Sequence, residues 1–191
     1  MAKGQTPSQT VGPFFHYGLT PGHSGYDFFR SLVPTRLDDP TASGERIRVF
    51  GRVVDGEGAP VTDAMLEFWQ ADAAGRYAHP ADARGANTPF RGFARMATDK
   101  DGRWVLETVK PGAIGDGQAP HLTVVLFARG MQNHLYTRIY FDDAADANGR
   151  DPVLMSVPVE RRNTLLARRT ADGYSFDIRI QGGEETVFFD V

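Results

Sequence analysis

The feature that most constrains this chain is the close spacing of its turn signals. Runs of Asp, Asn and Gly favour tight turns, because these residues tolerate a left-handed backbone or hydrogen-bond to their own backbone. Such runs occupy residues 55–58, 72–75, 99–102, 148–149 and 181–183. The segments between the turns are too short for the crossover helices that parallel strands need, so we expect short strands that pair antiparallel.

Eight segments between these turns are expected to be strands, because they are rich in β-branched and aromatic residues. In the first, which begins at Arg46, apolar side chains alternate with the others, as in a half-buried strand. The others are residues 65–70, 92–98, 103–108, 122–128, 135–141, 174–180 and 186–189. This pattern predicts an all-β fold, a two-sheet antiparallel β-sandwich. The expected core residues include Phe68, Trp69, Leu106, Val124 and Leu126.

Little of the chain is predicted to be helical. Residues 159–169 could form a brief helix, and residues 142–151, with four acidic side chains, are expected to be a solvated loop. Residues 1–45 contain five prolines and no sustained period, which predicts an extended N-terminal arm with one short helical turn near residues 26–32. We therefore expect a partner-contacting arm followed by a single sandwich domain at residues 46–191.

Composition narrows the classes of function. The 191 residues are 41% hydrophobic and 24% charged, which fits one globular domain with a real core. A net charge of -3 suggests neither nucleic acid nor an anionic membrane as a partner. The chain has no long apolar run and no apolar segment near its start, so the expected location is the cytoplasm.

The chain contains no cysteine, which excludes zinc-thiolate sites, iron-sulfur clusters and a thiol nucleophile. A metal site would need histidines, carboxylates or tyrosines. Tyr77 and His79 would project to the same side of an extended segment, and His121 opens a strand with Thr123 as its same-face neighbour. The residues alone leave a second interpretation open, in which His121 hydrogen-bonds within the fold and Tyr77 packs as an aromatic side chain.

Arg129 follows a predicted strand and precedes Gly130, at the rim of the expected sandwich. A guanidinium there could bind a carboxylate through two parallel hydrogen bonds, or it could be a solvated surface charge. The sequence has no Gly-x-Ser-x-Gly elbow, Walker loop, dinucleotide fingerprint or His-Glu-x-x-His run, so these four enzyme classes have no support.

Several ordered stretches carry a resemblance to a known family. They are TPSQTVGPF at 6–14, GRVVDGEGAPV at 51–61, EFWQAD at 67–72, GRY at 75–77, TVKPG at 108–112, APH at 119–121, RIYFDD at 138–143, FDIRIQG at 176–182 and ETVFFD at 185–190. In this order they resemble the intradiol ring-cleavage dioxygenases over nearly the whole chain. Within that family the arm and the C-terminal stretch resemble an alpha chain, which binds no iron.

The resemblance implies a subunit of an oxidoreductase. The alpha-beta enzymes of this family open protocatechuate with O2 to give 3-carboxy-cis,cis-muconate. Their catalytic beta chain holds Fe(3+) through two tyrosines and two histidines, and phenolate oxygens are hard donors that suit ferric iron. The implied partners are therefore the beta chain, protocatechuate and O2, in a higher oligomer of alpha-beta pairs, and the chain alone is expected to be inactive and to hold no metal.

Carried over to this sequence, the four iron-ligand positions are Tyr77, Ile114, His121 and Thr123. Isoleucine has no donor atom and threonine is a poor ligand, so two of the four ligands are missing. An arginine that steadies negative charge in the catalytic chain corresponds here to Gln118. The resemblance therefore implies that Tyr77 and His121 are remnants or local hydrogen-bonding groups.

The resemblance implies that this chain contributes substrate-binding residues, and not iron ligands, to the active site. A Phe-Ala-Arg-Gly motif of the alpha chain reaches the pocket of the beta chain, and its match makes Arg129 the main substrate-binding candidate. The arm borders the same pocket, which adds Thr10, Gly12 and Pro13. Gly12 and Pro13 could instead simply fix a turn, and Thr10 could cap a backbone group.

Two alternatives stand beside this interpretation. The first is a self-sufficient intradiol catechol dioxygenase that binds iron through Tyr77 and His121, with further donors such as His79 or Tyr136. The second is a transthyretin-like binding or scaffold module, which would explain residues 51–61 but not the arm or the C-terminal stretch.

Overall fold

The computed structural model describes residue 4, residues 6–85 and residues 88–191. Strands β1 to β9 span Arg46–Val54, Met65–Gln70, Phe93–Ala97, Arg103–Val109, His121–Phe127, Leu135–Phe141, Leu166–Thr170, Gly173–Ser175 and Ile178–Arg179. Helices α1 to α3 span Pro13–Leu19, Ala145–Asn148 and Pro152–Ser156. Short 3-10 helices lie at Ala83–Gly85, Asp142–Ala144 and Val159–Leu165. Strands dominate, so the predicted all-β class is confirmed.

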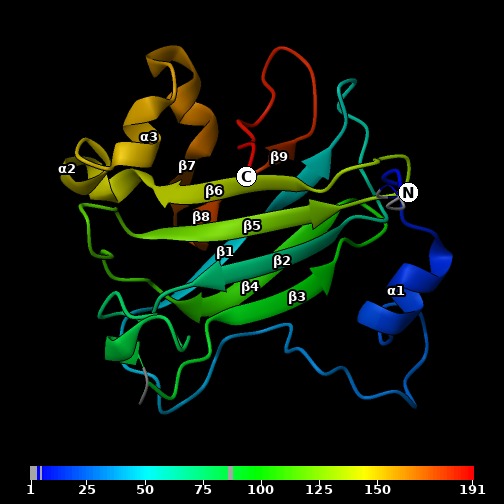
Figure 1. The fold of residues 1–191 in the computed structure, drawn as a ribbon, viewed down its shortest axis with the longest axis horizontal. Helices are drawn as coiled ribbons and strands as arrows, with labels where there is room; N and C mark the ends of the chain where they lie inside the picture. The colour runs from blue at the N-terminus through cyan, green and yellow to red at the C-terminus, as the bar shows by residue number, and fades with distance from the viewer. Residues whose placement is uncertain (1–3, 5, 86–87) are drawn as a thin grey trace.

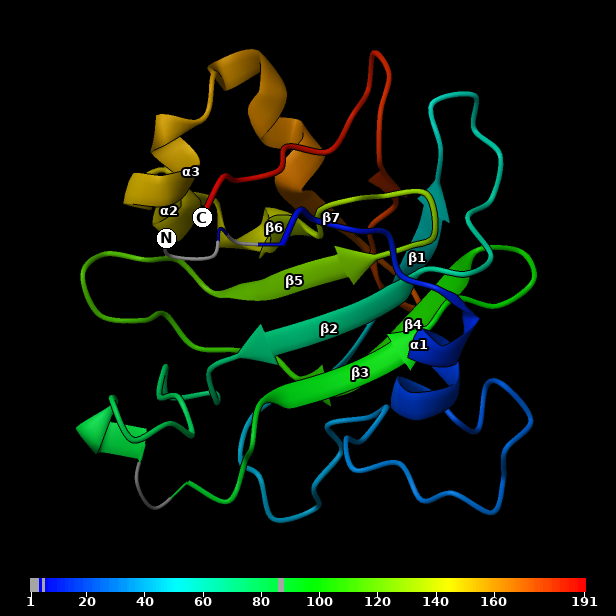
Figure 2. The same cartoon turned by 45° about the vertical axis from the view of Figure 1, so that its right-hand side comes forward.

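The strands form two layers that share one core. They follow the order β3-β2-β5-β6-β7-β8-β1-β4, and β9 pairs with β1. Figures 1 and 2 show β3, β2, β5 and β6 side by side, with β1 and β4 crossing behind them. The aromatic rings of Phe68 on β2 and Trp104 on β4 lie 5.2 Å apart between the layers. Both are buried, and so are Leu106, Val124 and Leu126, as predicted.

Trp69 is a correction to the predicted core. Along β2 the burial alternates, so Phe68 faces the core and Trp69, the next residue, lies half-buried on the opposite face. Successive side chains of a strand point to opposite sides, so these two neighbours cannot both enter the same core. The outer face that Trp69 occupies is the one that carries the candidate site described below.

The pairing is mixed rather than antiparallel throughout. Strand β6 pairs with β7 parallel, and β1 pairs parallel with both β8 and β9. The connection from β6 to β7 makes this possible, because it contains both α2 and α3 and is long enough for a crossover. The prediction of a solvated loop at residues 142–151 is therefore wrong: these residues form a 3-10 turn and α2.

Three other segments differ from the predicted elements. Residues 159–169 divide into a 3-10 helix and strand β7, and residues 174–180 divide into β8 and β9. Residues 186–189 form no strand; their backbone makes isolated bonds, such as the one from Phe189 N to the carbonyl of Tyr136 at 2.8 Å. Apolar residues there pack against the smaller buried cluster around Leu154 and Leu165 without a neighbouring ladder.

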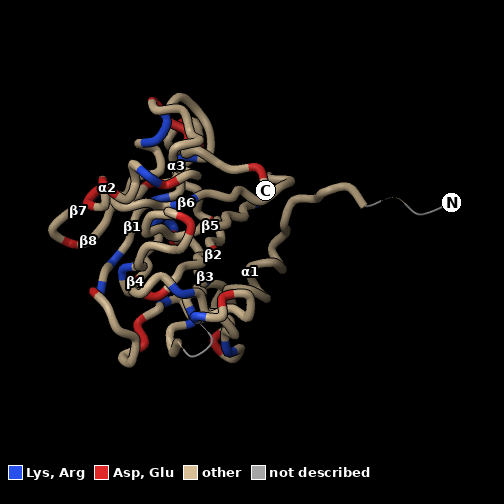
Figure 3. The backbone as a smooth tube through the Cα atoms, turned by 60° about the vertical axis from the view of Figure 1, so that its left-hand side comes forward, with Lys and Arg blue, Asp and Glu red and all other residues tan. Residues whose placement is uncertain are grey.

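The arm carries its helix earlier than predicted. Helix α1 begins at Pro13 with Gly12 as its N-cap, which suits the fixed backbone of proline at the first helical position. Residues 26–32 contain only turns and bends. Figure 3 shows acidic and basic residues intermixed along the backbone. In the described parts of the chain no helix has the length and apolar character needed to cross a membrane.

The later part of the arm is fastened to the sandwich. The backbone N of Arg95 donates to the carbonyl of Pro34 at 3.0 Å, and the backbone N of Leu37 donates to the carbonyl of Glu107 at 2.8 Å. Leu37 and Ala42 are buried in the main core cluster. The segment between α1 and Pro34 exposes Phe28, Phe29 and Leu32.

We predict that Phe68→Ala lowers the free energy of unfolding by about 3 to 5 kcal/mol, because it opens a cavity between the two layers where the Phe68 ring meets Trp104. Urea denaturation of the full chain measures this. Phe14→Ala is the matched control, since the Phe14 ring is 84% exposed, and it should change the free energy by less than about 0.5 kcal/mol. Equal losses in the two variants would contradict this assignment of the core.

Candidate functional site

Strand β5 divides its side chains between the core and a pocket. Leu122, Val124 and Leu126 face the core, so the residues between them face outward. His121 and Thr123 are among these outward residues, yet both are buried, because loops and neighbouring strands cover this end of the outer face. The sequence-based prediction that His121 and Thr123 share one face is thus confirmed.

The outer face of β2, β5 and β6 carries an open pocket of about 770 Å³. Its lining residues are Trp69, Tyr77, His79, Ala81, Asp82, Phe93, Thr123, Val125 and Tyr136. The rings of Trp69 and Tyr77 stack with centroids 5.7 Å apart and only 4° between their planes, and His79 meets the Trp69 ring edge-on. Tyr77 and His79 therefore do project into one place, as their spacing predicts.

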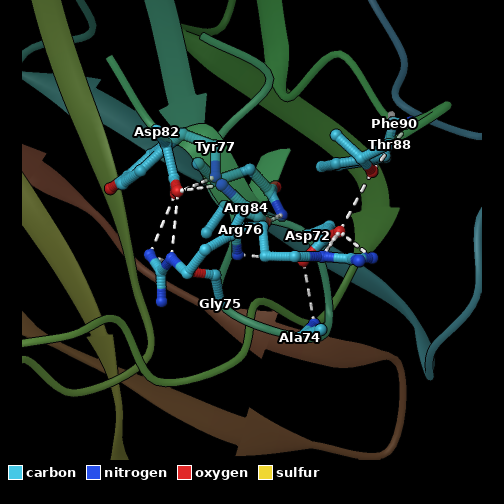
Figure 4. A network of polar contacts seen from close by, with 11 residues as sticks. Asp72, Ala74, Gly75, Arg76, Tyr77, Asp82, Arg84, Thr88 and Phe90 are labelled. Atoms are coloured by element: carbon cyan, nitrogen blue, oxygen red, sulfur yellow. Dashed lines mark hydrogen bonds and ion pairs between the residues drawn. The ribbon is translucent and has the colours of Figure 1, made fainter. Parts of the chain in front are cut away.

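A network of hydrogen bonds builds the loop that presents Tyr77 (Figure 4). The Asp72 carboxylate accepts from the backbone N of Ala74 at 2.9 Å and of Arg76 at 3.0 Å. The Asp82 carboxylate accepts from the backbone N of Tyr77 at 3.0 Å. Hydrogen bonds from the Arg84 guanidinium hold the pKa of Asp82 well below its usual range. The turn signal at 72–75 locates this loop in the sequence, but nothing there indicates that Asp82 would fix Tyr77.

Gly75 lets a second loop approach the Tyr77 loop. Its backbone is in the left-handed region at φ 73°, and an added Cβ would lie only 1.9 Å from the carbonyl oxygen of Ala113. Ile114, the next residue, is half-buried, and its backbone N donates to the carbonyl of Gln118 at 3.0 Å. The contact at Gly75 thus brings the loop that carries Ile114 up to the loop that carries Tyr77.

His121 is held as a neutral imidazole. Its Nδ1 lies 2.8 Å from the carbonyl oxygen of Ala119, so Nδ1 carries the proton and donates it to that oxygen. Burial, and after it the charge of Arg138, lowers the pKa of His121 to about 4. Burial also raises the pKa of the Tyr77 phenol. At neutral pH both groups are therefore uncharged in the folded protein.

The donor set at these positions does not fit ferric iron. Tyr77 and His121 have suitable donor atoms, whereas the Ile114 side chain has none and Thr123 offers a neutral hydroxyl. His79 is engaged elsewhere, since its Nδ1 accepts from the backbone N of Ala81 at 3.1 Å. Within residue 4, residues 6–85 and residues 88–191, no three His, Cys, Asp or Glu side chains are placed to hold a metal ion.

The other predicted residues meet at the opposite end of β5. The hydroxyl of Thr10 accepts from the backbone N of Gly130 at 2.7 Å, which ties the arm to the turn that carries Arg129. Gly12 and Pro13 start helix α1 immediately after this tie. The sequence analysis placed four residues at one pocket, namely Thr10, Gly12, Pro13 and Arg129. In the structure these residues do lie close together.

Asp63 is the residue in this cluster that the sequence did not indicate. Its carboxylate forms an ion pair with Nε of Arg129, and its carbonyl oxygen lies 2.8 Å from Nε2 of His16 on α1. The Arg129 side chain remains 59% exposed, and no described residue bonds to its two terminal nitrogens. Asp63 thus fixes the guanidinium from one side and leaves its outer edge open to solvent. Residues 66 positions apart give no local signal for such a pair.

The two groups of residues are too far apart to serve one site in one molecule. Strand β5 ends at Phe127, four residues and about 13 Å beyond Thr123 at roughly 3.3 Å per residue, and Arg129 lies farther on, in the turn that follows. Arg129 therefore faces solvent well away from the Tyr77 pocket of its own chain.

Comparison with known proteins identifies the family of this chain. A protein-family model described as Dioxygenase matches residues 30–182. The chain is 52% identical to the protocatechuate 3,4-dioxygenase alpha chain of Burkholderia cepacia, over 98% of each chain. It belongs to the intradiol ring-cleavage dioxygenases. The resemblance found in the sequence motifs is confirmed, and the transthyretin-like alternative loses its support.

A more distant relative is a beta chain. The protocatechuate 3,4-dioxygenase beta chain of Burkholderia cepacia is 37% identical over 75% of this chain and 67% of its own length. Among solved structures, the dioxygenase domain of a dioxygenase carbohydrate-binding fusion from Streptomyces sp. SirexAA-E matches with a TM-score of 0.58 and 25% identity, over 93% of this chain and 99% of that domain. By sequence identity, the present chain is therefore more similar to this alpha chain than to this beta chain of Burkholderia cepacia.

We predict that His121 contributes to the loss of stability in acid. The unfolded chain has a histidine pKa near 6.5 and the folded protein one of about 4, so between these values the unfolded chain binds more protons and stability falls as the pH is lowered. From pH 7 to pH 4.5 this component is about 2 kcal/mol. Urea denaturation at both pH values should show that His121→Gln loses less stability than the wild type by about this amount.

The exposed His134 supplies the matched control, because His134→Gln makes the same chemical change on the surface. Its loss of stability between the two pH values sets the baseline. If His121→Gln and His134→Gln had the same pH dependence, His121 would not be the buried neutral group described here.

Proposed function

We propose that this chain is the alpha subunit of a protocatechuate 3,4-dioxygenase, and that it completes the active site of an iron-bearing beta chain. The 52% identity to an alpha chain over almost the full length supports this role. The relationship to a beta chain supports pairing between two homologous subunits. The reaction would be cleavage of protocatechuate by O2 to 3-carboxy-cis,cis-muconate, with Fe(3+) on the partner chain making the bound catechol reactive toward O2.

The observation that carries this proposal is the cluster at the end of β5. Arg129 is held by Asp63 through Nε, and no described residue bonds to its two terminal nitrogens. Two parallel N–H donors match the two oxygens of a carboxylate. Protocatechuate has one carboxylate, opposite the hydroxyl groups that react. Arg129 would hold that carboxylate and so place the hydroxyl groups at the partner's iron.

The arm would form the wall of the same pocket. The bond between Thr10 and the backbone of Gly130 fixes the arm beside Arg129. Gly12 and Pro13 then set the direction in which the chain enters α1, and the Phe15 ring packs 5.4 Å from Phe127 at the end of β5. These contacts position the arm without a charged group, so we assign Thr10, Gly12 and Pro13 to shaping the pocket rather than to the reaction.

The arm also presents the surface that we assign to the beta chain. Its exposed apolar side chains are Phe14, Tyr17, Phe28, Phe29 and Leu32. Most of them lie in one chain of ring contacts from Phe14 through Tyr26 to Phe29. Grouped exposed rings of this kind mark protein interfaces. We propose a permanent interface that buries more than about 2,000 Å².

The Tyr77 pocket would then be a remnant of an iron site. Tyr77 and His121 stand at two ligand positions, and Ile114 and Thr123 replace the other two. The alternative of a self-sufficient catechol dioxygenase requires two further donors at this place. The hydrogen bond to His79 and the lack of a donor on Ile114 speak against it.

We predict that Arg129→Ala, assembled with the beta chain, raises KM for protocatechuate by roughly 10-fold to 150-fold, because one charge-assisted contact to the substrate is lost. KM for catechol, which lacks the carboxylate, should change little. Arg129→Lys should fall between the wild type and the alanine variant, since an ammonium keeps the charge without the two parallel donors. Steady-state kinetics on both substrates measures this.

Arg103→Ala is the matched control, because Arg103 is a similarly exposed arginine that pairs with a neighbouring aspartate at 3.2 Å on the other layer. It should leave KM for both substrates unchanged. An equal loss on protocatechuate and catechol in Arg129→Ala would show that Arg129 serves the interface or the fold instead of the substrate.

We predict that the chain purified without its partner binds no stoichiometric iron, because only two of the four ligand positions carry suitable donors. Metal analysis after incubation with ferric iron and gel filtration measures this. One tightly held iron per chain, with the red-brown colour of tyrosinate-to-iron charge transfer, would overturn the assignment as an alpha subunit and favour the self-sufficient enzyme.

A further inference from the structure

Arg138 is a cation of the Tyr77 pocket region that the proposed function does not use. It lies on β6 directly opposite Thr123 in the antiparallel ladder, on the same outward face of the sheet. Side chains at such paired positions lie about 5 Å apart at Cβ. Arg138 therefore stands beside one of the four positions that correspond to iron ligands.

The hydrogen bonds of Arg138 lead to the other residues of this region. Its Nη1 donates to the side-chain oxygen of Gln118 at 3.0 Å and to the hydroxyl of Tyr140 at 3.3 Å. Tyr140 is paired with His121 across the ladder, and their rings are 5.6 Å apart. The Tyr140 hydroxyl in turn donates to the buried carboxylate of Asp151 at 3.1 Å. The groups in direct contact with the guanidinium are thus neutral, and the nearest carboxylate lies beyond Tyr140.

The charge of Arg138 has no carboxylate partner. Among the described residues, no Asp or Glu lies within 4.0 Å of it, although other half-buried cations have such partners, as Arg95 does in Glu67. Nε of Arg138 is buried and has no hydrogen-bond partner in the described structure. A half-buried cation without a carboxylate in direct contact is costly, so its retention at this place needs an explanation.

The charge of Arg138 acts on the two groups that still have suitable donor atoms for a metal, His121 and Tyr77. After burial, the charge of Arg138 is the next cause that lowers the pKa of His121. It also opposes the rise that burial produces in the pKa of Tyr77. Tyr77 lies on the loop after β2 and His121 on β5, so the guanidinium is close to elements from two sides of the pocket.

We propose that the guanidinium of Arg138 takes the place of the metal charge in this pocket and excludes iron by repulsion. This inference rests on the proposed function, which identifies Tyr77, Ile114, His121 and Thr123 as the remnant ligand positions. In this proposal three residues prevent iron binding: Ile114 and Thr123, which lack suitable donors, and Arg138, which repels the metal ion. Restoring the missing donors would then be insufficient, because a ferric ion would have to enter beside a fixed positive charge in a poorly solvated site.

The test compares two variants of the full chain. The first, Ile114→Tyr with Thr123→His, restores the donors and keeps Arg138. The second adds Arg138→Gln, which removes the charge and keeps a side chain able to bond to Gln118 and Tyr140. We expect iron bound after gel filtration to be higher in the second by on the order of tenfold or more, with tyrosinate-to-iron absorption appearing only there.

The matched control replaces a second arginine of the same kind. Arg161 is half-buried, has an Nε without a partner, and donates to the carbonyl of Glu185 at 2.8 Å. Added to the two donor substitutions, Arg161→Gln changes the net charge equally but outside the pocket, and should leave iron binding as low as in the first variant. Arg138→Lys in the same background should also bind little iron, because it keeps the charge.

Two results would overturn the proposal. One is equal iron content with Arg138 and with Gln at this position; the other is an equal gain from Arg161→Gln. If circular dichroism showed that the Gln variant does not fold, Arg138→Met in the same background would make the comparison, with the same expected gain. These outcomes are independent of the proposed function, whose failure would appear as iron in the unmodified chain or as unchanged kinetics in Arg129→Ala.

Discussion

The two-residue repeat of side chains along β5 is the constraint on which the rest of the molecule depends. The strand is paired on both edges, to β2 and to β6, so it can neither shift nor rotate without breaking two ladders. One set of alternate residues fills the space between the layers. The other set places Thr123 in the wall of the Tyr77 pocket and the buried His121 on the same face beside it. The same strand ends at the turn that carries Arg129. The register of β5 against β2 and β6 therefore fixes three things together: the core, the pocket and the position of Arg129, the candidate substrate-binding residue.

This arrangement shows why substitutions at the positions that we propose to correspond to iron ligands need not disturb the architecture. The positions that correspond to iron ligands lie on the outer face and on two loops, whereas the buried cluster between the layers contains none of them. Replacing a donor by Ile114 or Thr123 therefore leaves the packing of Phe68 against Trp104 untouched. The arm end, with Asp63 and Arg129, is equally independent of the pocket. A subunit pair can in this way divide between two chains the tasks that a single-chain enzyme combines.

The sequence predicted those parts of the structure that depend on local pattern. Seven of the eight predicted segments contain strands, and together they hold every observed strand except β7. The spacing of residues also predicted that Tyr77 and His79 project to one place and that His121 and Thr123 share one face. It did not predict what depends on distant partners. Trp69 was assigned to the core because apolar character alone does not say which of two adjacent residues faces inward. Strand β7 was missed because its five residues LARRT have no apolar alternation, and they pair only because the helices before them return the chain to β6. Asp63 and Arg138 matter only through contacts that no local motif records.

The two attachments of the arm have a consequence for assembly. Thr10 is bound to the Gly130 turn, and Pro34 and Leu37 are bound to β3 and β4. The exposed apolar side chains between them, from Phe14 to Leu32, therefore belong to a closed loop and not to a free tail. Closing such a loop removes much of its conformational entropy while this chain folds. A partner would meet a surface whose shape is already restricted, so less ordering would oppose association and a given number of aromatic contacts would hold the two chains more tightly.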